Sequence, residues 1–208
     1  MKKLSILFLS LFFTISYSQT EEVVDSSDSK SKIYVGVGLG LSSASLSDDF
    51  DADLSTGLNV NFINLGYRFS ETWGATLNLS SAGHVLKDED DISVGIAYLG
   101  IGPMYTFSLS ERVSWDLKPQ LAFNLTGVVE EDGELSESTL EKGTGFVFGN
   151  SLVFGDGAKG FSFSVDLDYM SGKFKSIEED GVSVDLDSVD FDGAISNFKL
   201  GVGVRYNF

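Results

Sequence analysis

Apolar residues recur at every second position through most of this chain, and this period restricts the fold more than any other feature. In the clearest segment, residues 113–125, the apolar residues Val113, Trp115 and Leu117 alternate with polar residues such as Asp116. Successive side chains of a strand point to opposite faces, whereas a helix would mix these residues on one face. The segment is therefore predicted to be a β-strand with one apolar face and one polar face.

Eight segments have this alternation, and we expect each of them to form a strand. They are residues 33–42, 57–69, 72–83, 92–107, 113–127, 144–154, 160–171 and 198–208. The alternation changes phase between Phe62 and Ile63 and again between Tyr98 and Leu99. One extra residue moves the following side chains to the opposite face, so the sequence predicts a β-bulge at both places.

The connections between these segments alternate in length. Short turns follow the second, fourth and sixth segments, whereas longer acidic loops follow the first, third, fifth and seventh. An even-stranded barrel in an outer membrane has short periplasmic turns, longer extracellular loops and both termini at the short-turn side. We therefore expect an all-β fold, namely a transmembrane antiparallel up-and-down β-barrel of eight strands.

The pentapeptide SVDLD occurs twice, at residues 164–168 and 183–187. The first copy belongs to the seventh alternating segment, and the second lies in the last long loop. A β-hairpin in that loop would extend beyond the membrane and raise the number of strands to ten. Ten strands is therefore a minor alternative to eight.

Alternation alone does not separate a membrane barrel from a soluble lipocalin-like barrel, which turns its apolar face inward. The aromatic residues favour the membrane barrel, because they gather at the predicted short-turn edge. They are Tyr67, Phe69, Trp73, Tyr105, Phe107, Trp115, Phe154, Phe161, Phe163, Tyr206 and Phe208. A membrane interface accommodates such a girdle, whereas a soluble core has no reason to collect aromatic rings at one end.

The N-terminal residues have the features of a secretory signal peptide. Lys2 and Lys3 precede an apolar run that is too short to cross a bilayer as a helix, and small residues precede Gln19. We divide the chain into a signal peptide (1–18), a polar periplasmic lead-in (19–31) and an outer-membrane barrel (32–208).

Cysteine is absent, which excludes a disulfide scaffold and a thiolate metal site. The net charge of −17 makes nucleic acid an unsuitable partner.

With the apolar face outward, the polar face encloses a network of charged residues inside the barrel. This predicted network consists of Arg68, Asp116, Lys118, Asp166, Asp168, Lys199 and Arg205. Its cations and anions can pair, and an eight-stranded barrel is narrow enough for side chains to fill it. Inward-facing glycines leave space, so a narrow channel or a small-ligand transporter is the alternative. They are Gly36, Gly38, Gly40, Gly100, Gly102, Gly201 and Gly203.

The chain offers few groups for catalysis. His84 is the only histidine, so no other histidine could serve the serines as a base. We expect no enzyme, no cofactor and no built metal site; a lipid-modifying enzyme that uses His84 and a loop carboxylate is a remote alternative.

The four long loops carry about two thirds of the 31 acidic residues. These carboxylates form a hydrophilic surface and could hold Ca²⁺ or Mg²⁺ loosely.

The last six residues, GVRYNF, resemble the C-terminal assembly signal of bacterial outer-membrane barrels, with Gly203, Tyr206 and Phe208 at its defining positions. Together with the signal peptide, strand count and loop lengths, this ending resembles the small eight-stranded outer-membrane proteins. Examples are the membrane domain of outer membrane protein A and the outer membrane protein X and W types.

That resemblance implies an outer-membrane location in a Gram-negative bacterium, with both termini in the periplasm. It also implies contact with outer-membrane lipid and lipopolysaccharide, and recognition of the C-terminal strand by the barrel assembly machinery. We expect a monomer with a structural or surface-interaction role and a polar interior filled by side chains.

Overall fold

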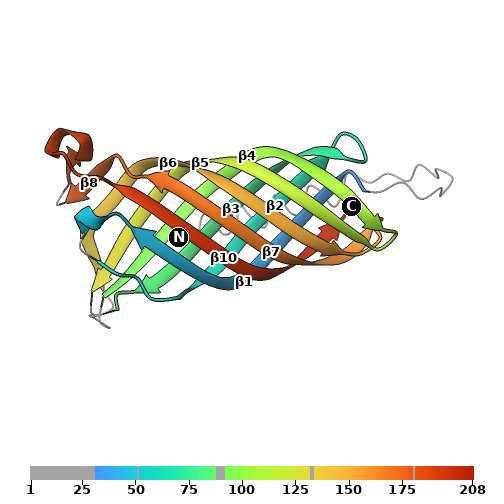
Figure 1. Ribbon diagram of the computed structural model, residues 1–208, viewed down its shortest axis with the longest axis horizontal. Coiled ribbons are helices and arrows are strands. Elements are labelled where there is room, and N and C mark those ends of the chain that lie inside the picture. The colour runs from blue at the N-terminus through green and yellow to red at the C-terminus, as the bar shows by residue number, and fades with distance from the viewer. Residues whose placement is uncertain (1–30, 51, 88–91, 132–133, 180) are drawn as a thin grey trace, which may run out of the picture.

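The structure is a computed structural model that describes residues 31–50, 52–87, 92–131, 134–179 and 181–208. Tilted strands form a barrel with a set of turns at one end and larger loops at the other (Figure 1). We call these the short-turn end and the long-loop end. The predicted signal peptide and nearly all of the predicted lead-in lie outside the described residues.

Eight antiparallel strands close the barrel, as predicted. They are β1 (Ile33–Leu46), β2 (Gly57–Arg68), β3 (Trp73–Val85), β4 (Ile92–Ser110), β5 (Val113–Glu131), β6 (Glu134–Phe154), β7 (Gly160–Lys173) and β10 (Ala194–Asn207). Their order around the wall is β5-β4-β3-β2-β1-β10-β7-β6, and pairing of β5 with β6 closes the circle. In this order β5 lies opposite β1, and β10 lies opposite β4. The β5–β6 pairing continues to Glu131 and Glu134, so this hairpin extends beyond its predicted ends.

Two further strands lie outside the closed wall. The strands β8 (Ser176–Glu179) and β9 (Val182–Asp185) form a hairpin in the last long loop, and β8 pairs with β6. The second SVDLD copy supplies most of β9. The ten-strand alternative is therefore correct for the number of strands and wrong for the barrel, because the hairpin adds to the extended part of β6. The same end carries two short 3-10 helices, η1 (Asp48–Phe50) and η2 (Leu186–Val189).

The bulge predicted in β2 is confirmed. The register between β2 and β3 shifts between Asn61 and Ile63, so Phe62 is the extra residue. The inward face of β2 passes from Asn59 and Asn61 to Gly66 and Arg68, as the change of phase requires. The bulge thereby keeps Arg68 inside the barrel.

The bulge predicted in β4 is wrong. Every second residue of β4 stays turned inward from Val94 through Tyr98 to Thr106, so the strand does not change faces. The register between β4 and β5 does shift beside Tyr98, but the extra residue belongs to β5. There Asn124 adopts a left-handed conformation with φ of 48°, which asparagine tolerates better than most residues. The apolar residues in the part of β4 near the long-loop end therefore face the interior.

The outer face of the wall is apolar, which excludes the lipocalin-like alternative. Large side chains such as Leu58, Phe62 and Phe198 are exposed on it. Aromatic rings contact one another across strands near the short-turn end. The ring centroids of Trp73 and Tyr105 lie 4.8 Å apart, and those of Phe161 and Tyr206 lie 5.1 Å apart. This is the arrangement of an interfacial aromatic girdle.

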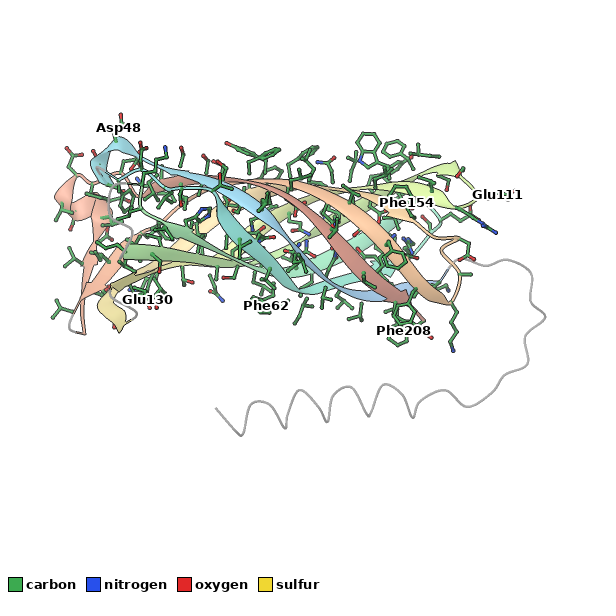
Figure 2. The ribbon with its side chains drawn as sticks, turned by 90° about the horizontal axis from the view of Figure 1, so that it is seen from below. Asp48, Phe62, Glu111, Glu130, Phe154 and Phe208 are labelled. Atoms are coloured by element: carbon green, nitrogen blue, oxygen red, sulfur yellow. The ribbon has the colours of Figure 1, made fainter. Side chains whose placement is uncertain are left out.

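Figure 2 shows the two ends of the barrel. Phe154, Phe208 and Glu111 lie at the short-turn end, whereas Asp48 and Glu130 lie at the opposite, long-loop end. The main-chain N–H of Phe208 donates to the carbonyl of Ile33 (3.0 Å), so the first and last barrel strands meet at the short-turn end.

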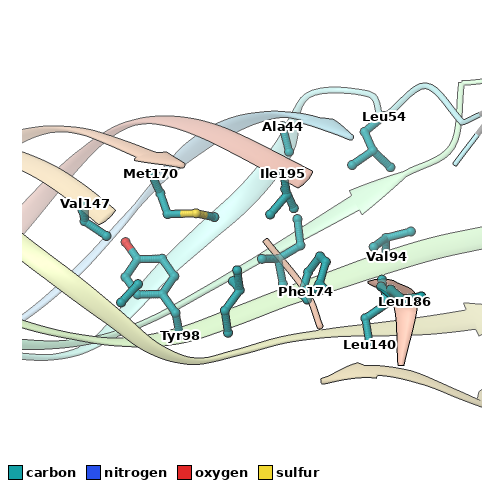
Figure 3. Packing of buried hydrophobic residues seen from close by; sticks show 13 residues of the cluster. Ala44, Leu54, Val94, Tyr98, Leu140, Val147, Met170, Phe174, Leu186 and Ile195 are labelled. Atoms are coloured by element: carbon teal, nitrogen blue, oxygen red, sulfur yellow. The ribbon is translucent and has the colours of Figure 1, made fainter. Parts of the chain in front are cut away.

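The interior has a polar part and an apolar part. The polar part occupies the short-turn end and the middle, where Arg68, Asp116 and Lys118 are buried. Toward the long-loop end, buried apolar residues such as Tyr98, Leu140, Phe174 and Ile195 form one cluster (Figure 3). The polar network was predicted, whereas the apolar cluster is a finding of the structure.

In the described part of the chain, no helix combines the length and the apolar composition needed to cross a membrane.

Candidate functional site

Two arginines share one carboxylate near the short-turn end. Arg205 Nη1 lies 2.7 Å and Arg68 Nη2 lies 3.9 Å from Asp116 Oδ2. Thr106 Oγ1 donates a hydrogen bond of 2.7 Å to the other carboxylate oxygen. Because Asp116 comes from β5 while the arginines come from β2 and β10, these contacts cross the lumen.

The ring of Tyr34 packs beside both arginines. It comes from β1, and its centroid lies 4.4 Å from the guanidinium carbon of Arg205 and 5.5 Å from that of Arg68. Its hydroxyl donates to Met104 Sδ at 3.5 Å. A side chain at Gly66 would overlap the Tyr34 ring, so glycine at this position is what admits the ring. The cation–π contacts and the ion pairs thus form one packed layer across the barrel.

A second polar cluster lies in the middle of the barrel, on β5, β6 and β7. Lys118 Nζ donates to Ser151 Oγ at 2.6 Å and lies 4.0 Å from Asp166 Oδ1. The Ser151 hydroxyl donates to the same carboxylate oxygen, and Ser164 Oγ donates to Asp166 Oδ2 at 2.8 Å. Every charged group of this cluster is buried and has a polar partner.

Lys199 crosses the lumen at a third level. From β10, its ammonium donates to Ser80 Oγ on β3 at 2.7 Å and to the hydroxyl of Tyr98 on β4 at 3.2 Å. It also lies 4.3 Å from the centroid of the Tyr98 ring. Lys199 is thus held by hydroxyl groups and an aromatic face from the opposite wall.

The structure places all seven residues of the predicted network inside the barrel. Among the described residues, ion pairs join Asp116 with both arginines and Lys118 with Asp166, whereas Lys199 and Asp168 make hydrogen bonds. The sequence analysis missed the neutral partners of these charges, which are Tyr34, Tyr98, Thr106 and Ser151. Their inward positions in the alternation were the available signal.

The inward-facing glycines do not by themselves open a passage. A Cβ atom on Gly36 would lie 2.9 Å from Cβ of Arg205, and one on Gly100 would lie 2.5 Å from Oε1 of Gln120. Gln120 in turn accepts a hydrogen bond of 3.2 Å from Asn78. At both glycines, the space is therefore occupied by a neighbouring side chain.

His84 is buried, although it lies near the end of its strand. The alternation of β3 turns it inward in phase with Ala82. Its Nδ1 lies 2.9 Å from the carbonyl oxygen of Ser55, and its Nε2 lies 3.2 Å from Ser42 Oγ. Ser42 also donates to Asn197 Oδ1 at 2.6 Å. His84 therefore belongs to a polar cluster that ties β3 to β1, β10 and the first long loop.

The acidic loops form exposed ion pairs. Lys173 Nζ lies 3.0 Å from Asp187 and 3.6 Å from Asp192, and the hydrogen bond to Asp187 raises the pKa of the Lys173 ammonium. Lys87 pairs with Asp53 at 3.5 Å. Over the residues that the structure describes, no three or more histidine or acidic side chains are grouped so that they could hold a metal ion. Loose binding of divalent cations by the loops stays a prediction.

Two solved structures of bacterial surface proteins align with this chain. Neisserial surface protein A is similar in structure, with a TM-score of 0.56 and 18% identity over 86% of this chain and 99% of that protein. Ail, the attachment invasion locus protein of Yersinia pestis, aligns with a TM-score of 0.47 and 14% identity over 86% of this chain and all of that one. No curated protein matches the sequence significantly.

A family model supplies the assignment. The outer membrane protein beta-barrel domain model matches residues 5–208, which is nearly the whole chain. The apolar outer face, the aromatic girdle and the closed circle of eight antiparallel strands are the features that such a domain requires in a membrane. The chain belongs to the outer membrane protein beta-barrel domain family of bacterial outer-membrane proteins.

Proposed function

We propose that this protein is a non-enzymatic outer-membrane barrel whose interior is filled by polar side chains and whose role is structural or surface interaction. The observation that carries the proposal is the set of contacts that cross the lumen. Asp116 reaches from β5 to Arg205 on β10, and Lys199 reaches from β10 to Tyr98 on β4. A hydrated pore would need these contacts to be broken.

The energetic cost of opening the interior supports the same proposal. Removing one partner from a buried, hydrogen-bonded ion pair costs about 3–5 kcal/mol, because the other charge is left without compensation. The Arg68–Asp116–Arg205 group and the Lys118–Asp166 pair lie at different levels of the barrel. Opening a continuous channel would therefore disrupt several such groups together.

The orientation is part of the proposal. The short-turn end and both ends of the barrel domain face the periplasm, and the long acidic loops face the cell exterior, as in other even-stranded outer-membrane barrels. An epitope inserted at Gly181, in the turn between β8 and β9, should bind antibody on intact cells. The same epitope inserted in the 155–159 turn should bind only after the outer membrane is permeabilised. The reverse result would invert the orientation.

Planar bilayer recording tests the filled interior. The purified folded protein should produce no discrete conductance steps, and a Lys87→Ala control should behave in the same way, because Lys87 lies in an exposed loop. Discrete steps in the unaltered protein, changed in size by Arg68→Ala or Lys118→Ala, would establish the channel alternative instead.

A further inference from the structure

An apolar cavity of about 220 Å³ lies inside the barrel at the long-loop end. Its lining combines strand residues such as Val94 and Ile96 of β4 with loop residues such as Phe50 and Leu86, and every lining residue is apolar. At this level of the barrel the cavity is apolar, and the polar cluster of His84, Ser42 and Asn197 lies on β3, β1 and β10. Apolar pockets of this kind, bounded by a rigid wall, are where small ligands bind in proteins.

Buried apolar side chains pack beside the cavity, toward the middle of the barrel. Ile96 and Leu125 are almost completely buried and belong to the apolar cluster, which separates the cavity from the lumen-crossing contacts of Lys199. Phe174 and Leu140 continue this cluster up the cavity wall. A molecule in the cavity would thus have access to the long-loop end and not to a continuous passage.

The loop above the cavity is fastened on two sides. The Phe50 ring meets the Phe191 ring edge-on at a centroid distance of 4.9 Å, which links the first long loop to the last. The N–H of Asp192 donates to Asp49 Oδ2 at 2.5 Å beside this contact. On the other side, Leu54 and Leu86 form a β-bridge. The loop is held in place over the cavity, so the cavity is part of a built structure.

The lining and the surroundings of the cavity specify the chemistry of its occupant. An apolar cavity gives water no hydrogen-bonding partners, and an engineered one of about 150 Å³ binds benzene. A water molecule occupies roughly 30 Å³ in the liquid. If each non-hydrogen atom of a ligand, with its hydrogens, takes the same volume, the cavity holds about seven to eight of them. Charged residues of both signs adjoin the lining residues in the chain: Asp53 follows Ala52, Lys87 follows Leu86, and Lys173 and Lys175 flank Phe174. The apolar lining itself offers no partner to a buried charge, so it disfavours a charged group inside the cavity.

We propose that this cavity binds a small uncharged hydrophobic group of about seven to eight non-hydrogen atoms. The group is either a free monocyclic aromatic molecule or the end of the alkyl chain of an amphiphile. This inference goes beyond the proposed function, because neither conductance nor surface interaction requires a ligand in the cavity.

Methyl NMR of the folded protein in phospholipid nanodiscs tests the proposal, with toluene as the probe. The methyl groups of Ile96 and Ile195 line the cavity, whereas Ile101 lies on the outer face of β4 with 47% exposure. Toluene should shift the Ile96 and Ile195 signals to saturation. The Ile101 signal should change only in proportion to the toluene dissolved in the lipid. Cavity signals that follow Ile101 without saturating would overturn the proposal.

Two substitutions of equal size separate the cavity from the lipid-facing surface. Val94→Phe fills the cavity and should abolish the saturable shift, whereas Val60→Phe, on the outer face of β2, should preserve it. Ala52→Phe fills the cavity from the loop and provides a second variant if Val94→Phe does not fold. Saturable binding that survives both cavity substitutions would overturn the site.

Two further probes define the ligand. Octylamine carries a cationic head on an eight-carbon chain, and saturation by octylamine alone assigns the cavity to an amphiphile chain. Saturation by toluene alone assigns it to a free aromatic molecule. Nitrobenzene and benzoate have the same size and planar shape, and only benzoate is charged. We expect benzoate to bind at least about tenfold more weakly than nitrobenzene, and equal binding of the two would overturn the charge selection. All these outcomes are independent of the conductance test.

Discussion

Arg205 Nη1 lies 2.7 Å from Asp116 Oδ2, although the two residues are 89 positions apart in the chain and stand on different sides of the lumen. The contact connects the last strand of the barrel to its fifth barrel strand, which do not pair through their backbones. Arg68 approaches the same carboxylate oxygen from β2. One buried carboxylate thereby holds three parts of the wall at a fixed separation.

Replacement of Asp116 should be strongly destabilising. In Asp116→Asn two buried guanidinium groups lose their anion, and we expect the free energy of unfolding to fall by about 3–5 kcal/mol. Urea unfolding in phospholipid vesicles, followed by the fluorescence of Trp73 and Trp115, measures this change. Both tryptophans lie on the outer face, so their emission reports departure from the lipid.

Two variants serve as controls for Asp116→Asn. Arg205→Met should cost less, because Asp116 keeps Arg68 as its partner and the remaining charges balance. Asp53→Asn removes an exposed pair with Lys87 and should change stability by less than about 1 kcal/mol. Equal effects of Asp116→Asn and Asp53→Asn would contradict the buried network.

Gly66→Ala should destabilise the barrel, because the new methyl group overlaps the Tyr34 ring that packs on Arg205 and Arg68. We expect a loss of about 1–3 kcal/mol, the usual range for overpacking a filled interior. Gly83→Ala is the matched control, because nothing lies within 4 Å of a Cβ atom at that position in β3. The temperature at which the folded band disappears on detergent gels measures both, and equal losses would refute the tight fit.

His84→Ala should affect stability rather than chemistry. Loss of the imidazole leaves the Ser55 carbonyl without its side-chain partner, while the Ser42 hydroxyl keeps only its hydrogen bond to Asn197, and we expect a cost of about 1–3 kcal/mol. The mass spectrum of the outer-membrane lipids should be the same in cells with either form. A lipid modification that disappears in His84→Ala, with unchanged stability, would favour the remote alternative of a barrel enzyme.

Phe208 should matter for assembly as the aromatic residue that ends the last strand. The ring stacks edge-on against Tyr206 at 5.1 Å, and its main chain pairs with Ile33 and accepts a hydrogen bond from Ser31. Deletion of Phe208, or addition of a charged tail, should reduce the amount of folded barrel in the outer membrane more than Phe208→Tyr does. Quantification of the heat-modifiable form measures assembly, and equal amounts of all three would refute this role of an aromatic terminal residue.

The period-2 alternation was sufficient to predict the eight barrel strands, the bulge at Phe62 and the apolar outer face. These features depend on local geometry, since a pleated strand in lipid must turn its apolar side chains outward and pair all its backbone groups. The same alternation indicated which charges turn inward, as Arg68, Asp116 and Lys199 illustrate. For these features, the position of a residue along its strand determined which face it occupies, and the surrounding lipid determined that the apolar face points outward.

The alternation could not predict what depends on the closed barrel. The sharing of Asp116 by two arginines, and the reach of Lys199 to Tyr98, follow from which strands stand opposite one another. The inward apolar residues of β4 were interpreted as the sign of a bulge, because the alternation alone assigns apolar side chains to the outer face. In the structure, Val94 and Ile96 face an apolar cluster inside the barrel that loop residues complete. His84 is buried for the same reason. Periodicity assigns each side chain to a face, and only closure and loop packing decide what that face meets.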